Sequence, residues 1–255
     1  MKNLASAKWS PVMLLVATVA GGGDGAGEMR PLLEKVEQAS GGVRLRDAQS
    51  WTQTIHFKDP NEGVVTHRYF VELPDRFRLE AEYEEDTPDG KKRVILIDVV
   101  NGERAWQSKV YDGKMQGEAV VSGNKAAVMW SCRTAGAFAP MIPKLPGVQA
   151  SLLGESKMDG RDVVGVRAIV DSVDWSERLY YDQKTGRLLK REFDGVGKNK
   201  KAEASVLIYD DYRDWDGVPL GRVRMRQPDG KLVTEATVIK LELGVKLDPK
   251  LFGKP

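Results

Sequence analysis

The chain has 255 residues, of which 41% are hydrophobic and 30% are charged, and its 39 basic and 37 acidic residues give a formal net charge of +2. This composition excludes a largely disordered chain, and the near balance of charge lacks the basic excess that is typical of nucleic-acid-binding proteins. The single cysteine, Cys132, excludes an internal disulfide, a multi-cysteine metal cluster and a redox pair. Its apolar neighbours predict a small buried side chain.

The first 27 residues have the order of segments found in secretory signal peptides. Lys2 and Lys8 precede the apolar run PVMLLVATVA, and the small residues GGGDGAG follow it. The apolar run is about half of the ~20 residues that a membrane-spanning helix needs. We therefore predict cleavage between Gly21 and Gly27 and a soluble, exported domain over residues 28–255. A membrane anchor and a core helix are the alternatives.

A short helix is predicted directly after this segment, in EMRPLLEKVEQAS (28–40). Pro31 lies near its start, which is where a helix tolerates proline. Its apolar residues recur at helical spacing, at Leu32, Leu33, Val36 and Ala39. Gly41 and Gly42 end the helix.

The sequence then changes to the period of two that is typical of strands with one buried face. In RFRLEAEYE (76–84) every second residue is apolar or aromatic and the others are charged, and IKLEL (239–243) alternates in the same way. In WTQTIHF (51–57) the residues Trp51, Ile55 and Phe57 share one face. Turn signals with positive-φ residues separate such runs, at Pro88-Asp89-Gly90, Asn101-Gly102, Asp112-Gly113, Asp159-Gly160, Thr185-Gly186, Asp216-Gly217 and Asp229-Gly230. Most intervals are too short for a helical crossover, so the pattern predicts one continuous antiparallel meander.

One interval leaves room for a helix. The run NKAAVMWSCRTAGAFAPMIPKLP predicts a helix that begins near Asn124 and is stopped by Pro140, Pro143 and Pro146. This insert divides the meander into about five strands before it and about seven after it. No Pro/Ser-rich linker marks a second domain.

The residue types that carry catalysis are sparse. His56 and His67 are the only histidines, and neither lies in an HExxH or similar metal-binding spacing. The chain has no GxSxG motif and no phosphate-binding loop. Acidic runs such as Asp210-Asp211 and Glu84–Asp86 are typical of solvated turns, although paired carboxylates can do acid–base chemistry. We therefore expect a non-enzymatic protein without catalytic residues, metal or cofactor, and keep a hydrolase as a remote alternative.

Five phrases follow one another along the chain: VNGERAWQ (100–107), LLGESKMDGRDVVGV (152–166), LYYDQKTGRLLKREF (179–193), YDDYRDWDGVPLGRVRM (209–225) and the closing LDPKLFGKP (247–255). Taken in this order, they resemble the LolA and LolB family of lipoprotein carriers and receptors and its outer-membrane lipoprotein-sorting relatives, which implies a periplasmic location for the exported protein. Together they span most of the chain after residue 27. The resemblance implies a mainly β (α+β) fold, an unclosed and strongly curved antiparallel β-barrel of about 11 strands with a short N-terminal helix and a helical lid.

The resemblance also implies an apolar concavity that holds a lipid, a lipoprotein acyl chain or a related amphiphile. Burial of acyl chains needs no compact motif, since it is non-directional and spreads over many side chains. The candidate lining residues are Phe57, Val71, Phe77, Leu79, Met129, Trp130, Phe138, Met141 and Ile142. The alternative for each is a filled core. The alternative for the protein is an envelope-sensing or protein-interaction module that binds a polypeptide partner, and we expect no nucleic acid and at most peripheral contact with membranes.

Overall fold

The computed structural model describes residues 25–59, 63–116, 118–121, 123, 125–170, 175–196, 202–227 and 229–255. Most of the predicted signal segment and the predicted helix start at Asn124 lie outside these residues. The predicted first helix is present as α1 (Gly25–Ala39), with Pro31 inside it. It begins at Gly25, three residues before the predicted domain boundary at residue 28. The cleavage position and this boundary stay predictions.

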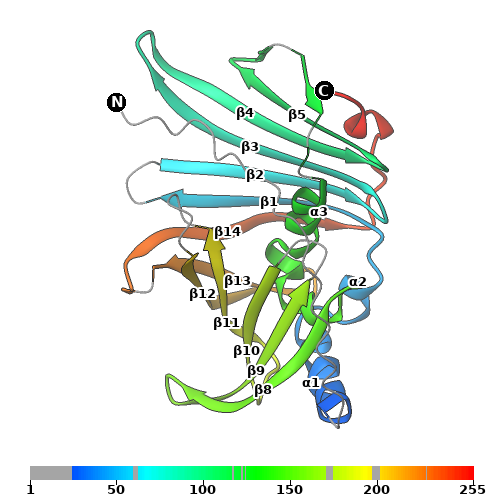
Figure 1. The fold of residues 1–255 in the computed structure, drawn as a ribbon, viewed down its shortest axis with the longest axis vertical. Helices are drawn as coiled ribbons and strands as arrows, with labels where there is room; N and C mark the ends of the chain where they lie inside the picture. Colours follow the sequence, from blue (N-terminus) through cyan, green and yellow to red (C-terminus); the bar gives the residue numbers. More distant parts are fainter. Residues whose placement is uncertain are drawn as a thin grey trace.

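The described strands form one antiparallel sheet that follows the chain as a meander (Figure 1). Its order is β6-β5-β4-β3-β2-β1-β14-β13-β12-β11-β10-β9-β8, and β7 pairs with β5. The strands are β1 (Ser50–Asp59), β2 (Gly63–Glu72), β3 (Arg76–Thr87), β4 (Gly90–Asn101), β5 (Arg104–Tyr111), β6 (Lys114–Met115), β7 (Val120–Val121), β8 (Gln149–Met158), β9 (Arg161–Val170), β10 (Trp175–Asp182), β11 (Leu188–Val196), β12 (Ala202–Trp215), β13 (Val218–Arg226) and β14 (Leu232–Leu243). The two end strands do not pair, so the barrel is unclosed, as predicted.

All seven predicted turns connect consecutive strands. Three of them are Asp-Gly pairs in which both residues have positive φ, for example Asp112 at 45° and Gly113 at 79°. This is the backbone of the tight turns whose twist matches that of the strands they join. The turn signals therefore predicted the antiparallel meander correctly.

The number of strands differs from the prediction of about 11, because the described residues hold 14. The C-terminal set has the seven strands expected. The N-terminal set has seven in place of five, since β6 and β7 are two-residue ladders on β5. Such short segments show no alternation in the sequence.

The helical insert is shorter and less regular than predicted. The α-helix α3 (Lys125–Thr134) ends before Pro140, because Ala135 is extended, with φ −72° and ψ 145°, and Gly136 after it takes a φ of 51°. The chain continues as the 3₁₀ helix η1 (Gly136–Lys144), which contains Pro140 and Pro143. Two further short helices are α2 (Val43–Arg46) and the 3₁₀ helix η3 (Pro249–Phe252).

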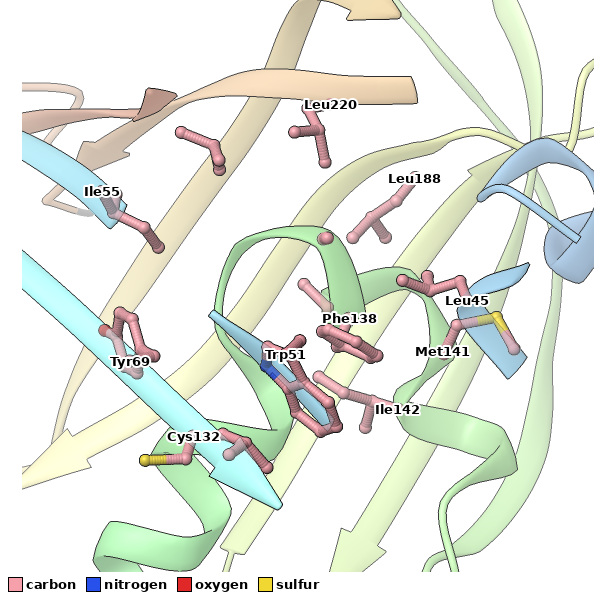
Figure 2. Close-up of a cluster of buried hydrophobic side chains, with 14 of the residues drawn as sticks. Leu45, Trp51, Ile55, Tyr69, Cys132, Phe138, Met141, Ile142, Leu188 and Leu220 are labelled. Carbon is pink, nitrogen blue, oxygen red and sulfur yellow. The ribbon is translucent and has the colours of Figure 1, made fainter. Parts of the chain in front are cut away.

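The sheet bends around the insert, so that β1–β5 cross β8–β11 steeply and α3 lies between the two halves (Figure 1). Side chains of β1, η1 and β11 fill the concave side near α1 and α2 (Figure 2). There the rings of Trp51 and Phe138 stack with centroids 4.1 Å apart. Cys132 is 1% exposed in the same cluster, which confirms its predicted burial.

A second, smaller cluster covers the convex face of the N-terminal half. The fully buried Phe252 of η3 packs there against Ile97 and Val99 of β4. Arg78 and Asn101 donate hydrogen bonds to the carbonyls of Leu251 and Phe252, at 3.0 and 3.2 Å. The C-terminal segment thus covers the convex face of the sheet around Ile97 and Val99.

Candidate functional site

The concave side is filled at one end and hollow at the other. A cavity of about 600 Å³, partly open to solvent, lies between the two halves of the sheet and α3. Its lining is mostly apolar and comes from both halves and from the insert. The lining residues are Ile55, Phe57, Tyr69, Leu79, Asp98, Gln107, Ala127, Val128, Trp130, Ser131, Thr134, Ala135, Gly136, Trp175, Arg191, Phe193, Leu207, Tyr209, Gly221, Val223, Met225, Thr234, Ala236 and Val238.

Three of the nine residues predicted to line a ligand site lie on this cavity. They are Phe57 of β1, Leu79 of β3 and Trp130 of α3. Whether they contact a ligand stays a prediction. The other six are absent from the lining: Val71, Phe77, Phe138, Met141 and Ile142 are buried in the filled end, and Met129 packs partly buried against it.

The far wall of the cavity comes from β10–β14, from which no lining residue was predicted. Trp175 and Phe193 stack there with centroids 5.1 Å apart, and Leu207, Val223 and Met225 continue the surface. The sequence does contain a signal for this wall. Trp175 is in phase with Leu179 and Tyr181 of the same strand, both of which are fully buried.

A buried ion pair interrupts this apolar wall. The Arg191 side chain is 8% exposed and the Glu177 side chain 0%, and the Nε and Nη2 atoms of Arg191 lie 2.8 and 2.7 Å from Oε2 of Glu177. Nη1 of Arg191 donates a 3.3 Å hydrogen bond to the Tyr209 hydroxyl. Burial alone would lower the pKa of Arg191, but Tyr209 and Glu177 outweigh it and raise that pKa. Arg191 therefore stays charged beside the cavity.

A second polar pair lies on the near wall, at adjacent positions of β4 and β5. The Gln107 amide donates a 2.9 Å hydrogen bond to Asp98. Burial raises the pKa of Asp98 despite this bond. The pair places a carboxyl group and an amide on the side of the cavity that α3 covers, and sequence analysis did not single out either residue.

The two histidines do not form a joint site. His56 pairs with Thr66 and His67 pairs with Ile55, so the histidine side chains leave opposite faces of the sheet. His67 packs beside the ring of Phe57 with centroids 4.5 Å apart, and its Nδ1 lies 3.1 Å from the Tyr69 hydroxyl. Burial lowers the pKa of His67 to about 4, so the imidazole is neutral at physiological pH.

Metal-binding geometry is also lacking in the described part of the chain, where no three His, Cys, Asp or Glu residues lie close enough to share an ion. Over the same residues, no helix combines the length and the apolar character that a bilayer crossing requires. The cavity offers an apolar surface with two polar points, which suits binding of an amphiphile.

An unclosed β-barrel with an internal apolar cavity beneath a helix is thus the class of structure that the chain adopts. Neither a protein-family model nor a curated protein matches the sequence. The structure is similar to that of a LolA superfamily protein from Nitrosomonas europaea, with a TM-score of 0.54 and 15% identity over 88% of this chain and 97% of that one. The predicted LolA-like fold is therefore confirmed.

Two further solved structures match with lower scores. One is a putative outer membrane lipoprotein-sorting protein domain from Vibrio parahaemolyticus, with a TM-score of 0.49 and 12% identity over 87% of this chain and 94% of that one. The other is a DUF1329 family protein from Desulfovibrio piger, with a TM-score of 0.47 and 13% identity over 88% of this chain and 97% of that one.

Proposed function

We propose that this protein is a non-catalytic carrier of the cell envelope that holds an acyl chain of a lipid or lipoprotein in its cavity. The observation that supports this most directly is the half-open 600 Å³ hollow with apolar walls. The LolA-like fold and the signal-like N-terminus agree with it: the N-terminus supports export, and the resemblance to LolA-like proteins supports a periplasmic location.

The size of the cavity fits a single acyl chain. A water-sized group occupies roughly 30 Å³, and a methylene is of similar size, so 600 Å³ holds about 20 such groups. Burial gives about 0.8 kcal/mol per methylene, which is on the order of 10 kcal/mol for a chain of some fourteen carbons before the cost of ordering it. This driving force needs no catalytic group.

The helix α3 is the part of the wall best suited to act as the predicted lid. It contributes Ala127, Val128 and Trp130 to the cavity. Polar contacts near the surface hold its two ends: Lys125 lies 2.9 Å from Glu103, and Arg133 donates a 2.8 Å hydrogen bond to the Pro74 carbonyl. Contacts of this kind contribute little stability each, whereas Val128 and Cys132 pack α3 into the core cluster. A ligand is therefore expected to move the Trp130 side of the wall and not to displace the whole helix.

The test combines native lipid analysis with a cavity-filling variant. Ala236 and Thr237 are neighbours on β14, but Ala236 lines the cavity and Thr237 is exposed. Protein purified from its own envelope should carry lipid in native mass spectrometry, and titration with oleate or a lysolipid should shift the fluorescence of Trp130. Ala236→Phe should weaken both effects, while Thr237→Phe should leave them intact. A wild-type protein that purifies empty and gives a flat titration would refute the proposal.

Polypeptide binding is the second candidate, and one observation favours it. The strand β8 ends the sheet, so its outer edge has no partner strand among the described residues, and Leu153 on it is 46% exposed. Such edges accept an added strand. A co-purifying polypeptide with no retained lipid in the same mass spectrum would favour this function over acyl-chain carriage.

A further inference from the structure

We propose that Arg191 and Tyr209 form a subsite for the uncharged carbonyl oxygen of an acyl ester. This inference rests on the proposed function, since it assigns the chemical class of the ligand in the same cavity. It predicts that the protein distinguishes acyl esters from free fatty acids and from bare hydrocarbons.

The pair has hydrogen-bond donors to spare. A guanidinium carries five N–H groups, and the contacts of Arg191 with Glu177 and Tyr209 occupy three of them. The Tyr209 hydroxyl accepts from Arg191, and among the described residues no acceptor for its own hydrogen is seen. Both side chains line the cavity, and the proposal assigns these remaining donors to one ligand oxygen.

The apolar surroundings make the ion pair hard to explain by stability. Leu207 lies opposite Arg191 in the sheet, Phe193 opposite Glu177 and Val223 opposite Tyr209. Replacing a buried ion pair by apolar residues of similar volume is often neutral or stabilising. Oε1 of Glu177 is in addition buried without a hydrogen-bond partner in this structure. A role in ligand binding explains why Arg191 and Glu177 are charged in a wall that is otherwise apolar.

The charge balance favours a neutral ligand oxygen. Glu177 already compensates Arg191, and Asp98 is the other charged side chain that lines the cavity. A fatty-acid carboxylate would add a second negative charge beside Glu177, without a free cation among the lining residues to balance it. A hydrocarbon, in contrast, would leave the donors of Arg191 and Tyr209 unpaired. An ester carbonyl accepts a hydrogen bond and brings no charge.

The experiment compares three ligands of equal chain length. Monooleoylglycerol, oleate and 1-octadecene, each delivered from methyl-β-cyclodextrin, compete with N-phenyl-1-naphthylamine for the full chain at pH 8. We expect monooleoylglycerol to bind most tightly. Tyr209→Phe should weaken its binding by about twofold to tenfold, as expected for one hydrogen bond, and leave octadecene unchanged. Tyr180→Phe is the matched control and should leave all three affinities unchanged, because Tyr180 is absent from the cavity lining and its hydroxyl contacts Glu192.

The outcomes separate this inference from the proposed function. If no ligand displaces the dye, acyl-chain carriage itself fails. If all three bind equally, or if oleate binds best, carriage stands and the ester subsite is refuted; the wild-type comparison decides this even if a variant folds poorly. Phosphatidylglycerol and a diacylated lipopeptide, added in separate competitions, then show which source of acyl esters the cavity prefers.

Discussion

The junction between α3 and η1 gives a sharp test of how the insert is held over the cavity. Gly136 sits there with a φ of 51°. A Cβ atom at this position would lie 2.4 Å from Oε1 and 2.6 Å from Nε2 of Gln53. Gln53 is 1% exposed, and its Oε1 accepts a 3.0 Å hydrogen bond from the Ala137 backbone N–H, so its amide cannot move away freely.

The substitution Gly136→Ala should therefore carry two costs. The left-handed backbone costs an L-residue about 1–2 kcal/mol, and loss of the buried hydrogen bond between Gln53 and Ala137 costs about 1–3 kcal/mol. The control is Gly147→Ala, because Gly147 has a φ of 80° and would place its Cβ in open space. The control should show the backbone cost alone.

Urea denaturation of both variants measures these costs, and dye displacement reports the effect on the cavity. We expect Gly136→Ala to lower the free energy of unfolding by about 1–3 kcal/mol more than Gly147→Ala and to weaken acyl binding, because Gly136 lines the cavity. Equal losses in the two variants would show that Gln53 does not fix the junction, and the reasoning would be wrong.

Three further predictions concern pH, the convex face and the thiol. Stability should fall by up to about 3 kcal/mol as pH drops from 6.5 to about 4, because the unfolded chain protonates His67 there and the native state does not; His67→Phe should flatten this part of the pH profile, and an unchanged profile in urea titrations would contradict it. Phe252→Ala should lower the free energy of unfolding by about 3–5 kcal/mol but leave acyl binding unchanged, since the ring packs on the convex face; a large binding loss in a folded variant would argue against this. Burial raises the pKa of Cys132, so Ellman's reagent at pH 8 should react only after unfolding, and fast reaction of the native protein would count against a closed cluster.

The sheet was predictable because its signals are local. An Asp-Gly pair such as Asp159-Gly160 determines a hairpin within two residues, and alternation along β3 shows which side chains face inward. The helical insert was predicted less well. Its proline positions suggested where the helix stops, whereas the helix ends earlier, at Thr134, and the chain then turns at Gly136 in close contact with Gln53, which is far away in the sequence.

The cavity was only partly predictable, because whether an inward side chain lines a hollow or fills a core depends on the opposite wall. All four of Phe57, Leu79, Val71 and Phe77 face inward. The first two line the cavity, whereas Val71 and Phe77 are buried in the core. Charged inward residues were missed for a related reason. Arg191 reads as a surface residue until the pairing of β10 with β11 places Glu177 near it.

The separation of the concave side into a filled and a hollow end assigns different roles to the predicted residues of the insert. Ile142 is fully buried in the filled end, and the buried Tyr181 hydroxyl donates a 2.9 Å hydrogen bond to the Pro140 carbonyl in the same segment. Trp130, on α3, faces the hollow end. The 3₁₀ segment therefore anchors the insert through the core, and α3 extends from that anchor over the cavity. Val128 and Cys132 pack α3 itself into the core cluster, so a ligand is expected to enter beside α3, along the Trp130 side, without disrupting the packing that stabilises the fold.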